Sequence, residues 1–565
     1  MKHHTKALTI FPLILFLANP SITTKQKKDT SNYYELMEGV YVSDQPGFYN
    51  TSFNLSFEYD DKYEISYKTN LTDDDMVIYE KDSEIDIKKV TSKSTSDYPL
   101  TTSVDGILEN YTGGKCSSDA YINNIQKTGD YVLYDKQPVV TIKVTDKETN
   151  SVVLERSLTY LIHDKITQNI SIPVISLSIS YDDIFGDSGF YNNIQDEISK
   201  RADMEYFDPE YNESFYRNTQ IKLGGNWTMG YPQRTFNLNF NKDQNGNKNE
   251  KVTEHVFKER TKRGNSKKRL TKLTRFRLHN GGNSFESSTR INDAVLQTIM
   301  QDSYASTTGY RPCIVYINGE YWGLMSIREH YKDVYFDNNY DVDKDNVITY
   351  DYKGTWSVDE GDETVGNEKI TALDNFISEN DFSSDEVYNT FINEYIDINS
   401  FMDVFIAQAY CGNWDFVGNY NNLKMWTVQT TSDDSEYTDG KFRFCLHDCD
   451  FAFTSDSNPM YKYHANSYSK FNILAALLKN SQFKKDFLAR AEYLINNNLS
   501  AYNCTKVLNE MVDEIRPYRD DSSLRWGQKE SDLYLWNVEV NNAFKFFKSK
   551  SETFIQELTN ALMMY

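Results

Sequence analysis

The residues best suited to chemistry lie in two short segments, residues 412–422 and residues 446–450. The first contains Asp415 and an amide-rich loop, and the second contains Asp448 and Asp450 among apolar residues. A carboxylate beside buried positions is costly unless a cation or dense hydrogen bonding compensates for the lost hydration. Carboxylate and amide oxygens are hard ligands that suit Mg²⁺ or Mn²⁺, with water or phosphate completing the shell. The two segments therefore predict a divalent-metal site.

Phosphoryl transfer requires the same set of groups. One Asp orients or deprotonates the acceptor hydroxyl, an Asn and a second Asp hold the metal ions, and a cation elsewhere steadies the phosphates. Residue types alone also permit a second interpretation, in which Asp415 lies in a solvated turn and Asp448 is a buried capping residue.

A helix and a strand are expected to deliver these carboxylates. Ser400 and Asp403 loosely fit a capping box, which predicts a helix that runs through Ala409 and delivers Asp415 at its C-terminal end. Apolar residues alternate from Phe442 to Phe453, which predicts a strand with one buried face around Asp448.

A glycine-containing strand–turn–strand is predicted over residues 221–238. Gly224 and Gly225 would let backbone amides approach phosphate closely. Arg234, in the returning strand, could hold phosphate oxygens bidentately. An ordinary hairpin would show the same pattern. Residues 251–277 then form a basic stretch, which suits either an acidic substrate or a solvated face.

A second hairpin is predicted over residues 314–325, because Asn318-Gly319 is the strongest short-range hairpin signal. Glu329 ends this stretch. It could pair with a cation on the nucleotide side, as a kinase Glu pairs with its Lys, or form a surface salt bridge.

Several short motifs of the sequence closely resemble those of the CotH (spore coat protein H) family of atypical kinases, most strongly over residues 170–480. They are Asn413-Trp414-Asp415, Gly418-Asn419, Asn421-Asn422-Leu423-Lys424-Met425-Trp426, His447-Asp448-Cys449-Asp450-Phe451-Ala452-Phe453, Asn318-Gly319-Glu320-Tyr321-Trp322-Gly323 and Ile327-Arg328-Glu329.

The resemblance implies roles for five residues of the two segments. Asp415 matches the catalytic Asp, and Asp448 matches the metal-binding Asp that corresponds to the kinase DFG aspartate. Asp450 occupies a more variable acidic position. The metal-binding amide is Asn419 if the motif is aligned from its left end and Asn422 if aligned from its right end, and Asn422 is slightly favoured.

The resemblance also implies an α+β fold, with an atypical protein kinase-like domain and a helical C-terminal lobe. Residues 468–565 have the apolar spacing of helices that would form this lobe. Residues 30–165 carry short alternating runs typical of a small all-β, immunoglobulin-like sandwich. The phrase Gln45-Pro46-Gly47-Phe48-Tyr49 resembles the chitobiase C-terminal-like module. We expect this module to act as a spacer or to contact a cell surface or polysaccharide, and we expect the kinase-like domain to span residues 170–565.

Composition and targeting signals indicate an exported protein. Residues 1–24 have the charged start and short apolar run of a signal peptide. No later run approaches the roughly 18 apolar residues that a membrane span needs. A formal net charge of -23 argues against a nucleic-acid binder. We therefore expect a secreted or cell-surface location, no transmembrane segment, and N-glycosylation at Asn-x-Ser/Thr sites if the host is eukaryotic.

The six cysteines permit disulfides in an exported chain. If Cys445 and Cys449 share a strand they cannot pair with each other, because four residues at about 3.3 Å each exceed bridging distance. Either one could reach Cys411 and link the two Asp segments, which is a testable hypothesis.

These features together lead to one expected function and two alternatives. We expect a secreted kinase that uses ATP with Mg²⁺ or Mn²⁺ to phosphorylate Ser or Thr of extracellular or surface proteins. The first alternative is a non-catalytic adhesin or scaffold with the same fold. The second is a carbohydrate-active enzyme, which would need an acid–base carboxylate pair at a defined separation.

Overall fold

The computed structural model describes residues 33–70, 75–89, 136–162, 170–191, 193–194, 196–225, 227–231, 233–243, 246–258, 260–263, 268–270, 272–284, 289–416, 422–453, 472–526 and 530–563. The predicted signal segment, Cys116 and Asn419 lie outside these residues. None of the helices within these ranges is long and apolar enough to cross a membrane.

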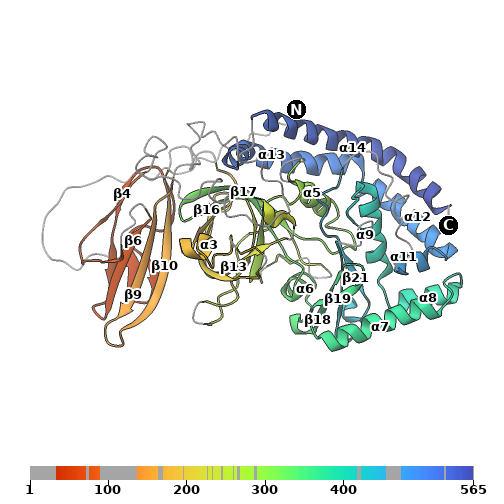
Figure 1. Cartoon of the computed structure of the whole chain (residues 1–565), viewed down its shortest axis with the longest axis horizontal. Helices are drawn as coiled ribbons and strands as arrows, with labels where there is room; N and C mark the ends of the chain where they lie inside the picture. Colours follow the sequence, from red (N-terminus) through yellow and green to blue (C-terminus); the bar gives the residue numbers. More distant parts are fainter. Residues whose placement is uncertain are drawn as a thin grey trace, which may run out of the picture.

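The N-terminal region is all-β and lies at one end of the molecule (Figure 1). Its sheets have the orders β1-β2-β5, β3-β10-β9-β6-β7 and β4-β8. Most pairs are antiparallel, but β3 runs parallel to β10. The strands are β1 (Tyr34–Met37), β2 (Val40–Val42), β3 (Gly47–Tyr49), β4 (Phe53–Leu55), β5 (Phe57–Tyr59), β6 (Tyr63–Thr69), β7 (Val77–Ile78), β8 (Ile85–Ile87), β9 (Val139–Asp146) and β10 (Ser151–Ile162).

A closed barrel follows, with the strand order β11-β12-β13-β14-β15-β17-β16. Apolar residues such as Phe236, Leu238, Phe276 and Ile327 alternate along its strands and form a buried core. The barrel was not part of the expectation from sequence. Its strands are β11 (Val174–Ser178), β12 (Lys200–Asp208), β13 (Glu213–Gly224), β14 (Thr235–Asn239), β15 (Arg275–His279), β16 (Tyr310–Ile317) and β17 (Glu320–Arg328).

The β16–β17 hairpin confirms the turn predicted at Asn318-Gly319. Both residues have positive φ, +52° and +78°, as a two-residue hairpin turn of this kind requires.

The remaining part of the chain packs a four-stranded sheet, β19-β18-β20-β21, against helices (Figure 1). The strands are β18 (Val347–Tyr352), β19 (Trp356–Glu360), β20 (Leu423–Val428) and β21 (Arg443–Cys445). The main helices are α5 (Asn292–Ile299), α6 (Asp333–Tyr340), α7 (Glu363–Glu379), α8 (Asp385–Glu394), α9 (Ile398–Cys411), α11 (Asn472–Leu477), α12 (Ser481–Asn496), α13 (Ala501–Arg525) and α14 (Glu530–Leu562). The C-terminal helical lobe is present as predicted.

The capping box predicted at the start of α9 is wrong. Asp397 is the N-cap, and its side chain accepts from the Ser400 backbone N–H. Ser400 lies inside the helix, where its hydroxyl bonds the backbone of Phe444 in β21. Its side chain therefore joins the helix to the sheet and does not begin the helix.

The all-β region meets the barrel along β10. Two carboxylates of the barrel accept hydrogen bonds from backbone N–H groups of this strand. Asp203 of β12 accepts from the Ser157 backbone N–H at 3.0 Å, and Glu205 accepts from the Thr159 backbone N–H at 2.7 Å. The second Glu205 oxygen has no hydrogen-bond partner in the described part of the chain and lies 3.8 Å from Arg156 Nη2. Burial raises the pKa of Glu205 to about 7.

The raised pKa of Glu205 predicts that the stability of the folded protein depends on pH. Between about pH 4.5 and pH 7 the folded protein retains the Glu205 proton that the unfolded chain, with a Glu pKa of roughly 4.3, has released. The free energy of unfolding should therefore fall as pH rises through this window, by up to about 3 kcal/mol from this group. Urea unfolding of wild type and Glu205→Gln from pH 4.5 to 8 measures the effect, and equal slopes in the two proteins would contradict it.

Candidate functional site

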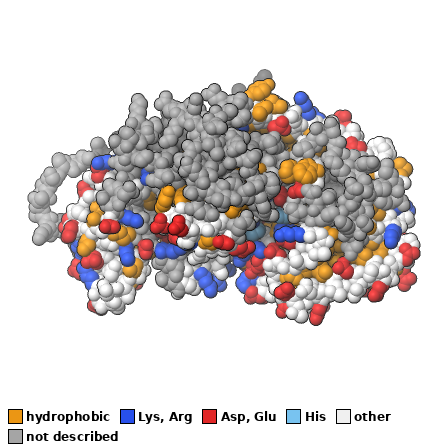
Figure 2. Space-filling view, in the orientation of Figure 1, with side chains coloured by type: hydrophobic (Ala, Val, Ile, Leu, Met, Phe, Trp, Pro, Cys, Tyr) orange, Lys and Arg blue, Asp and Glu red, His pale blue; other side chains and the backbone are white. Residues whose placement is uncertain are grey.

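A cavity of about 920 Å³ lies between the barrel and the β18–β21 sheet. One wall is the outer face of β13, β14, β15 and β17, and the opposite wall includes the segments that carry Asp415 and Asp448. On this face of the molecule, acidic and basic side chains gather between the barrel and the helical lobe (Figure 2). Three histidines also line the cavity, His279, His330 and His447.

Helix α9 delivers the first segment. It ends at Cys411, and the left-handed φ of +72° at the next residue, Gly412, turns the chain toward the cavity. Asp415 follows three residues later, partly exposed, and lines the cavity. Its Oδ2 accepts a hydrogen bond of 2.9 Å from the Nδ2 of Asn422. The structure thus brings together Asp415 and the amide that the sequence slightly favoured.

The second segment is a loop, which corrects the predicted strand. β21 ends at Cys445, and Asp448 has a left-handed φ of +51°. Burial, followed by the nearby Asp293 and Asp415 carboxylates, raises the pKa of Asp448 to about 7. Burial and the Asp448 carboxylate also raise the pKa of Asp450. Both carboxyl groups line the cavity, where a bound cation would relieve the cost of ionising them.

The oxygen atoms at this site fit a divalent cation whose coordination shell is completed by water and a bound ligand. Asp448, Asp450 and Asn422 supply oxygen atoms to one cavity. In the described residues no three His, Cys, Asp or Glu side chains converge on a metal position by themselves. Mg²⁺ is usually held by one or two carboxylates together with waters and substrate phosphates, so these side chains match that mode of binding.

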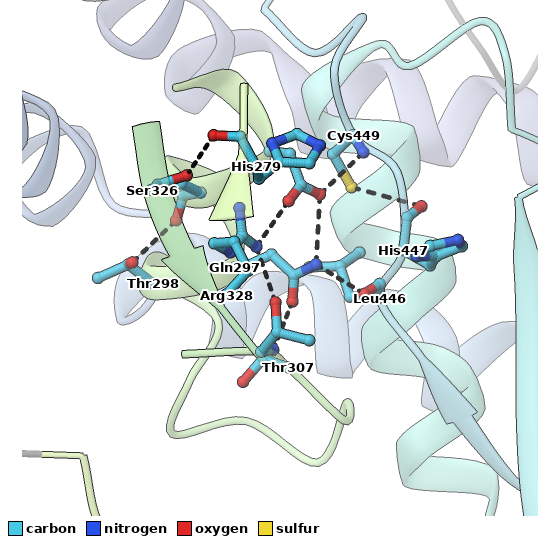
Figure 3. A network of polar contacts seen from close by, with 12 residues as sticks. His279, Gln297, Thr298, Thr307, Ser326, Arg328, Leu446, His447 and Cys449 are labelled. Carbon is cyan, nitrogen blue, oxygen red and sulfur yellow. Dashed lines mark hydrogen bonds and ion pairs between the residues drawn. The ribbon is translucent and has the colours of Figure 1, made fainter. Parts of the chain in front are cut away.

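Helix α5 holds the loop that carries both carboxylates (Figure 3). Asp293 accepts from the Cys449 backbone N–H at 3.0 Å, and Gln297 donates to the Leu446 carbonyl at 2.9 Å. Asn292 donates to the carbonyls of Asp450 and Ala452. Asp293 also pairs with Arg328 at 2.6 Å. Although burial opposes it, the Arg328 guanidinium lowers the pKa of Asp293 to about 2.

The polar residues of this helix were not among the site residues predicted from the sequence. A signal was present, because Asp293 and Gln297 are four residues apart and therefore share one face of a helix. Polar residues at such spacing in an otherwise apolar helix indicate a buried polar contact.

Gly282 sits against the second carboxylate. Its φ is +57°, and a Cβ atom at this position would lie 1.8 Å from Asp450 Oδ2. The neighbouring Asn283 backbone N–H donates to the same oxygen at 2.7 Å. Close approach of the backbone to Asp450 therefore requires glycine.

Gly282→Ala should displace Asp450 and, if this cavity carries out the phosphoryl transfer expected from the sequence, lower its rate by about 10²-fold, the usual cost of roughly 1 Å of misplacement. Steady-state kinetics together with the melting temperature measure the effect. Gly354→Ala is the matched control, because Gly354 also has a positive φ, +84°, with no atom within 4 Å of the added Cβ. Equal activity losses in the two variants would show that backbone strain, and not the Asp450 contact, is responsible.

A polar row crosses the barrel wall that faces the cavity. Strand register places Lys222, Asn237, Arg277 and Arg328 side by side on neighbouring strands, about 4.8 Å apart. Lys222 pairs with Glu197, and Arg328 pairs with Asp293.

Arg277 has no ion pair with a described carboxylate. Its Nε donates to Asn237 Oδ1 at 2.9 Å, and its Nη2 lies 3.1 Å from His330 Nε2. Burial, and then the Arg328 guanidinium, lower the pKa of Arg277 to about 10. Burial likewise lowers the pKa of His330, which leaves a neutral ring that can accept from Arg277. Arg277 thus lines the cavity near Asp448 with a largely desolvated guanidinium.

The structure places the other predicted phosphate contacts differently. Gly224 and Gly225 line the cavity at the end of β13. Arg234 does not line it. The guanidinium of Arg234 is buried, donates to the Tyr191 carbonyl at 2.6 Å, and lies 4.1 Å from the centre of the Tyr191 ring. The structure therefore does not support Arg234 as a phosphate ligand.

Glu329 borders the cavity, but its carboxylate binds buried residues of the protein interior. It pairs with Arg260 at 2.7 Å and accepts from the Gly309 backbone N–H and from Asn339. It thus anchors part of the basic stretch 251–277 and does not pair with a cavity cation. Other members of that stretch also pair with acidic residues, among them Lys258 with Glu514 and Lys272 with Asp337.

The predicted disulfide is absent. Cys411, Cys445 and Cys449 are buried free thiols. Gln408 lies between two of them, because its Nε2 donates to Cys449 Sγ at 3.4 Å and its Oε1 accepts from Cys411 Sγ at 3.8 Å. Hydrogen bonds therefore join the two Asp segments where a disulfide was expected.

Comparison with known proteins identifies the family of this chain. Residues 221–554, more than half of the chain, match the family model described as CotH kinase protein. No curated protein matches the chain. The matched residues include the end of β13, the strands β14 and β15, the α5 helix, both Asp segments and most of the helical lobe. The chain therefore belongs to the CotH family and has a kinase-like domain.

Proposed function

We propose that this protein is a secreted kinase that transfers the γ-phosphate of ATP to Ser or Thr of extracellular or surface proteins. One observation carries the proposal. Asp415, with the Asn422 amide bound to it, lines the same cavity as Asp448 and as Arg277, which forms no ion pair with a carboxylate of the described residues. These are the residue types that a phosphoryl-transfer site uses as general base, metal ligands and phosphate-binding cation, and their common cavity supports the proposal.

Each side chain has a separate task. Asp448, Asp450 and the Asn422 amide would hold a divalent cation, which when bound neutralises charge on the phosphates. Asp415 accepts the proton of the acceptor hydroxyl, since its carboxylate is partly exposed at the cavity. Arg277 binds and orients phosphate oxygens with its two-pronged guanidinium. Gly224 and Gly225 allow the phosphates close to the backbone at the end of β13.

Incubation with γ-labelled ATP, Mn²⁺ or Mg²⁺, and casein as a generic acceptor tests the proposal. We expect labelled phosphoserine or phosphothreonine, in the acceptor or in the protein itself, that disappears when EDTA removes the metal. Metal-dependent ATP binding without transfer would instead support the non-catalytic adhesin or scaffold. Release of sugar from polysaccharide would support the carbohydrate-active alternative.

A further inference from the structure

One buried amide connects the two segments of the candidate site. The Nδ2 of Asn413 donates to the Asp448 backbone carbonyl at 2.9 Å, across a sequence separation of 35 residues. Its Oδ1 accepts from the Asp415 backbone N–H at 3.3 Å. Asn413 is completely buried, so water does not compete for these contacts.

The Asp448 backbone requires such support. A left-handed φ is uncommon for residues other than glycine and costs of the order of 1 kcal/mol. The residue keeps its φ of +51° only if its surroundings hold it there. The peptide carbonyl that Asn413 binds belongs to Asp448 itself, so the contact acts directly on the residue whose side chain faces the cavity.

Gln408, one turn before the end of α9, fixes the Asn413 amide in turn. Its Oε1 accepts from Asn413 Nδ2 at 3.0 Å, and its Nε2 donates to Cys449 Sγ and to the His447 carbonyl. Gln408 is also completely buried. The two amides therefore form a small network that contacts the chain on both sides of Asp448.

We propose that Asn413, supported by Gln408, is a positioning residue that sets the Asp448 carboxylate relative to Asp415. The inference rests on the proposed function for its kinetic consequences. Asn413 does not touch the cavity, so it acts through Asp415 and Asp448 and not on the ligand. Its loss should affect the metal and the chemical step more than the affinity for ATP.

Removing the side chain should leave the fold in place. The two segments are also joined by a backbone hydrogen bond of 2.8 Å, from the Phe453 N–H to the Cys411 carbonyl. Asn413→Ala keeps this bond. Asn480→Ala is the matched control, because Asn480 is a completely buried Asn that caps α12 and makes three hydrogen bonds away from the cavity.

The experiment compares kcat, KM for ATP, and the Mn²⁺ activation constant in both variants, with the melting temperature as a measure of folding. For Asn413→Ala we expect kcat to fall about 10²-fold and the Mn²⁺ constant to rise about tenfold, with KM for ATP within about threefold. Asn480→Ala should lower the melting temperature with little change in any of the three constants. Kinetic constants for Asn413→Ala that match those of Asn480→Ala would overturn the proposal.

Gln408→Met provides a second variant that preserves side-chain size. It removes the acceptor for Asn413 but leaves the Asp448 contact, so a smaller effect of about three- to tenfold on kcat and the Mn²⁺ constant is expected. No change in this variant would show that Gln408 has no positioning role.

A direct measurement separates this proposal from the proposed function. Free Mn²⁺ is followed by electron paramagnetic resonance in titrations of wild type and Asn413→Ala in the presence of ATP. If wild type transfers no phosphate, the kinase proposal fails, but a weaker Mn²⁺ affinity in Asn413→Ala still supports the positioning role. Equal Mn²⁺ affinity in the two proteins contradicts the positioning role, whatever the activity of wild type.

Discussion

Asp415→Asn and Asp448→Asn should each abolish phosphate transfer while leaving the protein folded. Loss of the proposed general base at Asp415 is expected to lower kcat by at least about 10³-fold. Loss of the carboxylate at Asp448 should also raise the Mn²⁺ activation constant, because the amide is a weaker ligand for a hard cation. Initial rates over a Mn²⁺ titration measure both effects.

The metal-free stability of these variants gives an independent readout. Asp448 is half-buried near two other carboxylates, Asp293 and Asp415. Replacing it with a neutral amide removes this repulsion, so Asp448→Asn should melt at a higher temperature than wild type in EDTA. Added Mn²⁺ and ATP should stabilise wild type more than the variant.

Asp434→Asn, in an exposed loop, is the control for both measurements and should behave as wild type. Undiminished transfer in both Asp415→Asn and Asp448→Asn would show that the reaction takes place elsewhere.

Arg277→Gln should lower kcat/KM for ATP by about 10² to 10³-fold, the usual cost of removing a charge-stabilising donor at a reacting phosphate. The guanidinium has no carboxylate partner among the described residues, so its charge is available to a ligand. A neutral Gln at this position should cost little stability, because the loss of a desolvated charge offsets the lost hydrogen bonds. Kinetics at varied ATP and thermal melting check the two parts of this prediction.

Arg234→Lys is the matched comparison for Arg277→Gln. Arg234 is buried away from the cavity, where its guanidinium packs on the Tyr191 ring and donates to the Tyr191 carbonyl. A Lys lacks the planar guanidinium that makes these contacts, so the substitution should lower the melting temperature. Its kcat/KM per folded molecule should be unchanged. If Arg234→Lys lost ATP affinity and Arg277→Gln kept it, the assignment of the phosphate cation would be reversed.

The amino-acid sequence was sufficient to identify the two Asp segments, the hairpin at Asn318-Gly319 and the helical lobe. These features depend on local patterns, because motif spacing, turn chemistry and helical periodicity are all read within a few residues. The same local information was sufficient for the family, which the match over residues 221–554 confirms.

Only the tertiary structure decided which side chains join Asp415 and Asp448. Arg234 immediately precedes β14 and Arg277 lies on β15, and residue type does not distinguish them. Packing buries Arg234 against Tyr191, whereas the register of β14, β15 and β17 places Arg277 along the cavity. Register across strands far apart in the sequence depends on how the barrel closes, which no short stretch encodes.

Long-range packing likewise determined the remaining contacts. Glu329 finds Arg260 in the interior, Gln408 takes the place of the expected disulfide, and the polar face of α5 holds the Asp448 loop. Each partner is separated by many residues in the chain, and the pairings arise because buried polar groups must satisfy one another once the core has formed. The sequence therefore determined the chemistry available to this protein, and the packing of the barrel against the helical lobe decided its geometry.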